Sequence, residues 1–207
     1  MALTVLRLLL VPVFLYLLIS AAPARANFFP LDVKSLDQRR WLALGVFTLM
    51  AITDKLDGYL ARRLNQVSKL GTFLDPTADK LLVTGGFLVL VFPRFAPVGF
   101  NIPWPVLWGV YQKDICVLIG AAIVKCKIGK VQINASTPGK INTAMEVALV
   151  IATLLAPEWM LISPTFAAVF LWTLWHLTVL ATAAAAVGYS MEGARQLREA
   201  AANKSLS

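Results

Sequence analysis

Apolar runs of bilayer-spanning length occupy most of the chain. A transmembrane helix needs about 17 to 25 mainly apolar residues, and runs of roughly that length lie at 3–22, 41–61, 70–92, 104–124, 141–157 and 165–188. Hydrophobic residues make up 58% of the chain and charged residues 14%, a balance that excludes an ordinary soluble domain. The sequence therefore predicts an all-α integral membrane protein with six transmembrane helices.

The Lys and Arg residues that flank these runs indicate an orientation. Cytoplasmic loops of membrane proteins carry an excess of Lys and Arg. With a cytoplasmic N-terminus, ten of these residues fall in inner segments and five in outer segments. We therefore expect both termini in the cytoplasm, a membrane domain over residues 1–190 and a cytoplasmic tail over 191–207. The net charge of +8 is explained by this asymmetry, so we expect no nucleic-acid partner.

The end of the first apolar run has a second interpretation. The stretch AAPARAN at 21–27 contains the small-residue pattern of a signal-peptide cleavage site. No positively charged region precedes the apolar run, and cleavage would leave five helices. We therefore expect the first helix to be retained.

Four aspartates stand close together in this apolar chain: Asp54, Asp57, Asp75 and Asp79. Separations of three and four positions place each pair on one face of a helix. The polar, basic stretch between the pairs predicts a turn at the cytoplasmic surface, so the two pairs would face each other. Four carboxylates without a cation would repel strongly, and their hard oxygens suit Mg²⁺, Mn²⁺ or Ca²⁺. We predict a functional metal site here rather than a purely structural set of salt bridges.

Two small residues beside the first aspartate pair allow a close approach to the helix. Gly58 and Ala61 lie three positions apart and share a face. Glycine inside a helix costs roughly 1 kcal/mol relative to alanine, which calls for a reason to keep it. Close packing of a second helix is one such reason, and a nucleotide base lying against the helix is the other.

The complete acidic stretch has the pattern D-x2-D-G-x2-A-R-x8-G-x3-D-x3-D, which resembles the signature of the CDP-alcohol phosphotransferases. Its fixed positions are Asp54, Asp57, Gly58, Ala61, Arg62, Gly71, Asp75 and Asp79. Residues 4–14, 65–82 and 138–143 extend the resemblance to enzymes that join CDP-diacylglycerol to glycerol-based acceptors. These include phosphatidylglycerophosphate synthases and single-motif cardiolipin synthases.

The resemblance implies a reaction and roles for the motif residues. A phosphatidyl group would pass from CDP-diacylglycerol to an acceptor hydroxyl, with release of CMP. Two divalent ions, Mg²⁺ or Mn²⁺, would be held by Asp54, Asp57, Asp75 and Asp79, of which Asp79 would also be the general base. The CDP moiety would be contacted by Asp54, Gly58, Ala61, Arg62 and Gly71. The resemblance further implies a homodimer in the cell inner membrane, with its active site on the cytoplasmic side.

A second basic cluster is expected to bind the acceptor. Lys113 lies in the fourth apolar run, and Lys140 follows a Pro-Gly pair at the expected start of the fifth helix. A phosphate-bearing acceptor would be bound by such cations. We expect glycerol 3-phosphate as the acceptor, as in phosphatidylglycerophosphate synthases. Those enzymes tend to have Arg-Glu where this chain has Lys113-Asp114, so phosphatidylglycerol, the acceptor of cardiolipin synthases, is the alternative.

Other classes of function fit the same residues less well. A divalent-cation transporter would hold its acidic site near the middle of the membrane, whereas these aspartates are expected near the cytoplasmic surface. An inactive scaffold is disfavoured because all four aspartates are present. His176, the single histidine, lies in an apolar run, and we expect it to bond to a neighbour rather than to act in catalysis.

Overall fold

A computed structural model provides the structure of the protein. It describes residues 2–21, 33–63, 69–96, 100–128 and 137–205. Within these ranges, side chains are described except at 2–5, 7, 33–35, 54–63, 69–79, 125, 127–128 and 200–205.

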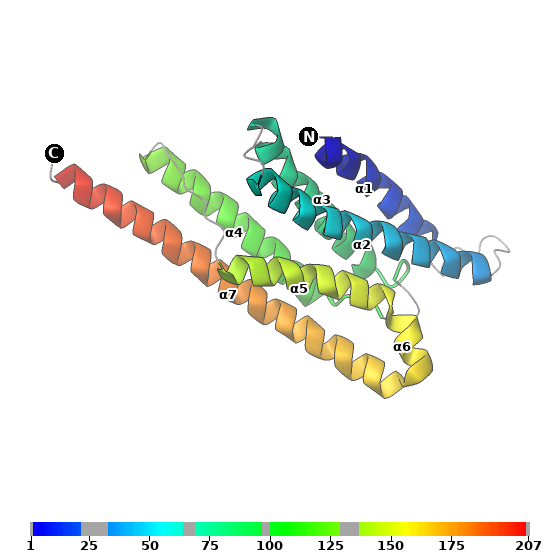
Figure 1. The fold of residues 1–207 in the computed structure, drawn as a ribbon. Coiled ribbons are helices and arrows are strands. Elements are labelled where there is room, and N and C mark those ends of the chain that lie inside the picture. Colours follow the sequence, from blue (N-terminus) through cyan, green and yellow to red (C-terminus); the bar gives the residue numbers. More distant parts are fainter. Residues whose placement is uncertain (1, 22–32, 64–68, 97–99, 129–136, 206–207) are drawn as a thin grey trace. The chain divides into compact units, whose positions relative to one another are not determined.

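The described part of the chain is helical and contains no strand. Its helices are α1 (Ala2–Ser20), α2 (Val33–Arg63), α3 (Lys69–Val91), α4 (Trp104–Ile128), α5 (Thr137–Leu154), α6 (Ala156–Ile162) and α7 (Pro164–Ser205) (Figure 1). The prediction of an all-α fold is therefore confirmed over these residues. Each predicted apolar run coincides with one of the long helices, and the short helix α6 was not predicted.

Proline and serine residues set the boundaries around α6. A proline lies at the start of α6, where the missing N–H is not needed for the helix. Ser163 ends α6 and precedes Pro164, the first residue of α7. The Ser163 hydroxyl accepts a hydrogen bond from the backbone N–H of Phe166 at 3.3 Å, which caps the N-terminus of α7. Two separate helices therefore follow α5.

The chain divides into two compact units, which we describe separately. The first comprises residues 1–102 and 147–171, and the second comprises residues 103–146 and 172–207. Both α5 and α7 contribute to each unit. The predicted boundary at residue 190 lies inside the continuous helix α7.

In the first unit, α1 packs against both α2 and α3 (Figure 1). Phe14 of α1 and Phe47 of α2 are fully buried, with ring centroids 5.2 Å apart. A Cβ atom at Gly86 of α3 would lie 3.5 Å from the Phe14 ring. Apolar side chains therefore bring α1 close to the two helices that carry the predicted motif.

A buried arginine joins α2 to the end of α5 and to α6 within the same unit. The guanidinium of Arg40 donates to the carbonyl oxygen of Leu154 at 2.5 Å and to Glu158 Oε2 at 2.7 Å. It also donates to Asp37 Oδ1, one turn earlier on α2, at 3.1 Å. Arg40 is 7% exposed, so its charge is held by these partners and not by solvent.

We expect Glu158→Gln to destabilise this part of the fold by about 1.5 to 2 kcal/mol. The substitution removes the charge that faces Arg40 across two helices, and hydrogen bonds to charged groups contribute about 1.5 to 3 kcal/mol each. Asp37 is half exposed, so Asp37→Asn is the matched control with a smaller expected loss. Thermal unfolding in detergent measures both, and equal losses in the two variants would contradict the account.

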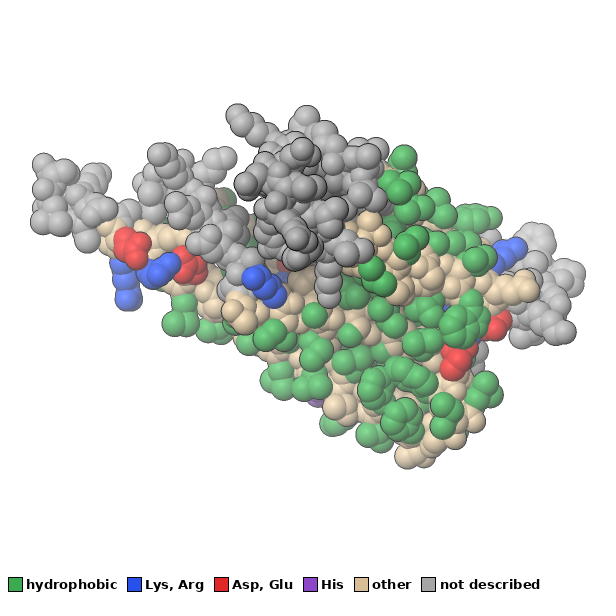
Figure 2. Space-filling model, viewed as in Figure 1, with side chains coloured by type: hydrophobic (Ala, Val, Ile, Leu, Met, Phe, Trp, Pro, Cys, Tyr) green, Lys and Arg blue, Asp and Glu red, His purple; other side chains and the backbone are tan. Residues whose placement is uncertain are grey.

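Two helices of the described residues are long and apolar enough to cross a membrane, namely α4 of the second unit and α7, to which both units contribute. Among the described residues, Trp104–Val124 and Pro164–Glu199 qualify as candidate spans. The pair α5 and α6, bent by 60° at the break between them, would be a third if the two form one span. Hydrophobic side chains cover much of the described surface in Figure 2. Two to three candidate spans are therefore found, and the six predicted spans and the predicted orientation stay predictions.

Candidate active site

All eight fixed positions of the acidic motif lie on helices. Asp54 and Asp57 belong to the C-terminal part of α2, and Asp75 and Asp79 belong to α3. The expected helical spacing of each pair is therefore present in the backbone, and α2 and α3 contact each other. The side chains of these aspartates, and residues 64–68 of the turning stretch predicted at 62–71, lie outside the described residues, so the meeting of the two pairs stays a prediction.

The donor set of the motif fits a divalent cation. Carboxylate oxygens are the ligands that Mg²⁺ and Mn²⁺ prefer, and two pairs, each within about one helical turn, supply four of them. Among the side chains that the structure describes, no group of three or more His, Cys, Asp or Glu residues could hold a metal ion. The chemistry of its four carboxylates makes the motif a candidate metal site.

His176 lies on α7 and bonds to its own helix. Its Nδ1 donates to the carbonyl oxygen of Trp172 at 2.7 Å, and the ring lies 4.0 Å from the Trp172 ring. The expectation that this histidine bonds to a neighbour is therefore confirmed.

Lys113, predicted to bind the acceptor, forms a buried ion pair in the second unit. Its ammonium nitrogen lies 2.9 Å from Glu146 Oε1 on α5 and 3.4 Å from Asp114 Oδ1 on α4. Lys113 is 9% exposed and Glu146 is 6% exposed. The Lys113 charge is thus already balanced by carboxylates of the chain itself.

The ion pair continues into a polar network that reaches α7. The amide nitrogen of Asn142 donates to Glu146 Oε1 at 2.5 Å. The Thr182 hydroxyl donates to Asn142 Oδ1 at 2.7 Å and also lies 2.8 Å from the carbonyl oxygen of Thr178. Asn142 is 1% exposed and Thr182 is 3% exposed. We call Lys113, Glu146, Asn142 and Thr182 the buried network; it connects α4, α5 and α7.

The sequence prediction missed three members of the buried network, but a signal was present. Glu146 is the single acidic residue of the apolar run at 141–157. Lys113 is the single basic residue of the run at 104–124. Charged residues inside membrane helices pair with one another, so these two could have been matched. Asn142 and Thr182 carry no comparable signal, because polar uncharged residues are common in such helices.

Lys140, the other predicted acceptor-binding residue, lies in the first turn of α5 and is exposed. Asn142 follows it by two residues on the same helix. The structure therefore connects Lys140 to the buried network through a short stretch of α5. It places Lys113 in the ion pair and Lys140 at an exposed position.

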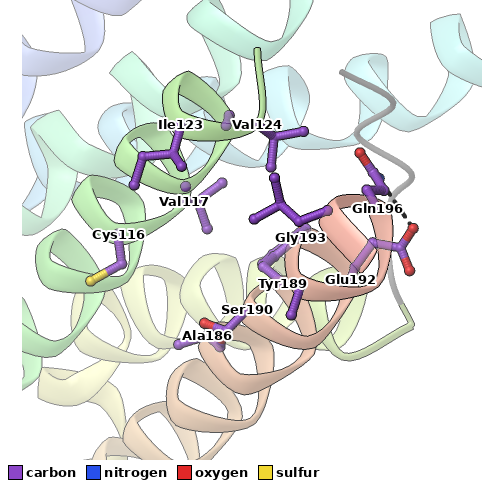
Figure 3. A pocket seen from close by; sticks show the side chains of 14 residues that line it. Cys116, Val117, Ile123, Val124, Ala186, Tyr189, Ser190, Glu192, Gly193 and Gln196 are labelled. Carbon is purple, nitrogen blue, oxygen red and sulfur yellow. Dashed lines mark hydrogen bonds between the residues drawn. The ribbon is translucent and has the colours of Figure 1, made fainter. Parts of the chain in front are cut away.

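A cavity of about 270 Å³ lies between α4 and α7 in the second unit (Figure 3). Its α4 wall includes Val117, Gly120 and Val124, and its α7 wall includes Tyr189 and Gly193. Most of these side chains are apolar or small, and neither Lys113 nor Lys140, the predicted site residues whose side chains the structure describes, lines the cavity.

Comparison with known proteins identifies relatives over most of the chain. The model of the CDP-alcohol phosphatidyltransferase family matches residues 1–183. A human cardiolipin synthase (CMP-forming) is 30% identical over 173 residues, which cover 76% of this chain and 54% of the human protein. The CDP-diacylglycerol–glycerol-3-phosphate 3-phosphatidyltransferase of Bacillus subtilis is 33% identical over 178 residues, which cover 86% of this chain and 87% of that enzyme. The chain thus spans about half the length of the human relative and most of the bacterial one.

Proposed function

The chain belongs to the CDP-alcohol phosphatidyltransferase family, and from this membership we propose that it transfers a phosphatidyl group from CDP-diacylglycerol to a glycerol-based acceptor and releases CMP. One observation carries the proposal. Every fixed position of the acidic motif is present with its spacing intact, and all of them lie on α2 or α3.

The four motif aspartates are proposed to bind metal ions, and one of them is proposed to accept a proton as well. Asp54, Asp57, Asp75 and Asp79 would hold two divalent ions, Mg²⁺ or Mn²⁺. Such ions, when bound, neutralise charge on the pyrophosphate and on the leaving group. Asp79 would accept the proton of the acceptor hydroxyl. The acceptor oxygen then bonds to the phosphorus on the diacylglycerol side, and the bond from that phosphorus to CMP breaks.

The remaining motif residues are proposed to bind the CDP moiety. Arg62 would pair with the pyrophosphate, because a guanidinium binds phosphate oxygens through two parallel hydrogen bonds. Gly58 and Ala61, which lack bulky side chains, would let the nucleotide lie against α2. Gly71 would allow a similar approach at the start of α3, and Asp54 would contact the nucleotide as well as the metal.

The proposed acceptor is glycerol 3-phosphate, bound by Lys140 and Lys113. The Bacillus subtilis relative, which is named for this acceptor, matches this chain over most of both lengths. Phosphatidylglycerol is the second candidate. Two observations favour it: the human relative is named as a cardiolipin synthase, and Lys113 is paired with Glu146, which leaves less positive charge for a phosphate monoester.

The proposed setting is the cell inner membrane, which the chain would cross with six helices and with both termini in the cytoplasm. The membrane domain would comprise residues 1–190, followed by a cytoplasmic continuation of α7 over 191–207. The candidate spans on α4 and α7 support a membrane location. The active site would face the cytoplasm, and the protein is proposed to act as a homodimer among membrane lipids, without nucleic acid.

Release of CMP by the purified protein tests this function. Each reaction contains the protein, CDP-diacylglycerol, Mg²⁺ or Mn²⁺, and one acceptor. The acceptors tested in separate reactions are glycerol 3-phosphate, phosphatidylglycerol, inositol phosphate and serine. We expect CMP and a lipid product with glycerol 3-phosphate. A product with phosphatidylglycerol alone would replace the proposed acceptor, and no CMP with any acceptor would overturn the proposed reaction.

We expect Lys140→Gln to raise the KM for glycerol 3-phosphate about tenfold, because a hydrogen bond to a charged group contributes about 1.5 to 3 kcal/mol. The KM for CDP-diacylglycerol should change less than twofold. Arg198→Gln is the matched control, since Arg198 is an exposed cation on α7 outside the proposed site. Steady-state kinetics at saturating CDP-diacylglycerol measures the effect, and an unchanged acceptor KM would remove Lys140 from the acceptor site.

A further inference from the structure

Side chains of the buried network bond the first half of α5 to α4 and α7. Glu146 and Asn142 lie on α5, and they bond to Lys113 of α4 and Thr182 of α7. We propose that Glu146, Asn142 and Thr182 are positioning residues, which hold the first turns of α5 so that Lys140 stays in place for the acceptor. This inference rests on the proposed function.

The geometry of the buried network is specific, because each of its four side chains forms a hydrogen bond with at least one other member. Burial of an amide or a carboxylate in an apolar environment is unfavourable unless its hydrogen bonds are made. Asn142 meets this requirement on both sides, with its nitrogen directed to Glu146 and its oxygen to Thr182. A rotation or a shift of α5 would break the bond between Thr182 and Asn142 and the bond between Lys113 and Glu146, so one orientation of the helix is favoured.

Lys140 is coupled to this network by the rigidity of the helix. It precedes Asn142 by two residues, which is about 3 Å along a helix axis. The backbone of Asn142 cannot move without moving Lys140. Displacement of a binding group by about 1 Å can reduce a reaction rate by up to about a hundredfold. The hydrogen bond between Thr182 and Asn142 therefore influences the position of Lys140, although Lys140 takes no part in that bond.

Asn142 and Thr182 act through Lys140 rather than on the acceptor itself, because both side chains are almost fully buried. A second threonine of α7, Thr178, offers a matched comparison for Thr182. Thr178 and Thr182 are both buried, lie one turn apart on α7, and each lies 2.8 Å from the carbonyl oxygen four residues before it. The difference is that the Thr182 hydroxyl also donates to Asn142.

The test compares Thr182→Val with Thr178→Val in the full-length protein. Valine keeps the shape of threonine and removes the hydroxyl, so both variants lose a bond within α7 and Thr182→Val alone loses the bond to Asn142. We expect Thr182→Val to raise the KM for glycerol 3-phosphate about fivefold, because the lost hydrogen bond is worth about 1 kcal/mol. The KM for CDP-diacylglycerol should change less than twofold in either variant. Thr182→Ser, which keeps the hydroxyl, should restore most of the acceptor KM.

Each outcome decides for or against the inference. A role in stability alone would lower the unfolding temperature of Thr182→Val and its yield of active enzyme without a selective change in acceptor KM. Equal acceptor KM values in Thr182→Val and Thr178→Val, with an active parent protein, would overturn the positioning role and leave the proposed function intact. No CMP release by the parent protein would overturn the proposed function and the positioning role with it. Thr182→Ala, which also removes the hydroxyl, serves the same comparison if Thr182→Val does not accumulate in the membrane.

Discussion

Asp79→Asn is expected to abolish turnover while binding of CDP-diacylglycerol persists. Asparagine has the shape of aspartate but cannot accept the acceptor proton, and loss of a general base reduces rates by about 10² to 10⁴. Asp54, Asp57 and Asp75, whose proposed roles are in binding alone, would remain to hold the donor through the metal ions. Asp57→Asn, in contrast, is expected to lose the metal-dependent binding of the donor as well as turnover.

Two assays separate these expected results. Binding of CDP-diacylglycerol is measured in the presence and absence of Mn²⁺, and CMP release is measured on the same preparations. Glu199→Gln is the matched control, since it removes an exposed carboxylate of α7 that lies outside the motif. Activity equal to that of the parent protein in Asp79→Asn or Asp57→Asn would refute the role proposed for that residue.

The ion pair between Lys113 and Glu146 is expected to show strong energetic coupling. Removal of one member of a buried ion pair leaves the other charge without its partner and costs about 3 to 5 kcal/mol. We expect Glu146→Gln to lower the free energy of unfolding by about 3 kcal/mol. This is the lower end of the range, because Asp114 remains 3.4 Å from the Lys113 ammonium. Lys113→Met should lower the free energy of unfolding by a similar amount, since Glu146 then loses its cation and, among the described side chains, keeps its bond to Asn142.

The double variant Lys113→Met/Glu146→Gln is expected to be more stable than the sum of the single changes predicts, by about 2 kcal/mol. Removal of both charges leaves no unpaired charge in the apolar interior. Denaturant unfolding in detergent, followed by tryptophan fluorescence, gives the four free energies of the cycle. The exposed pair Arg195 and Glu192, with atoms 2.8 Å apart, is the matched control and should show no measurable coupling. Additive changes at Lys113 and Glu146 would contradict the account.

The long helices were predictable from the sequence because each contains an apolar run. The N-terminal part of α2 was not, since residues 33–40 are largely polar and hydropathy gives no reason to extend the helix there. That part of α2 carries Arg40, which bonds to Leu154 of α5 and Glu158 of α6, both more than a hundred residues away in the sequence. The apolar run at 141–157 ends in a proline, which is consistent with a break in the helix near that point. The run alone does not predict that a separate short helix, α6, follows the break.

The acidic motif of the candidate site could be predicted from the sequence more completely than the acceptor side. The acidic motif is a local pattern, so the spacing of Asp54, Asp57, Asp75 and Asp79 was readable once helices were expected there. The acceptor side depends on contacts between helices that are distant in sequence. Lys113 therefore looked like a free cation, whereas the structure pairs it with Glu146.

Transfer of an isotope label tests the central claim most directly. The parent protein is supplied with CDP-diacylglycerol, a divalent cation and glycerol 3-phosphate that carries ¹⁸O in the hydroxyl expected to react, with a parallel sample of phosphatidylglycerol labelled in the same way. Mass spectrometry then locates the label. Direct attack by the acceptor oxygen predicts a phospholipid product that retains ¹⁸O and CMP that contains none. Label in CMP, a phospholipid product without label, or no CMP with either acceptor would contradict the proposed phosphatidyl transfer.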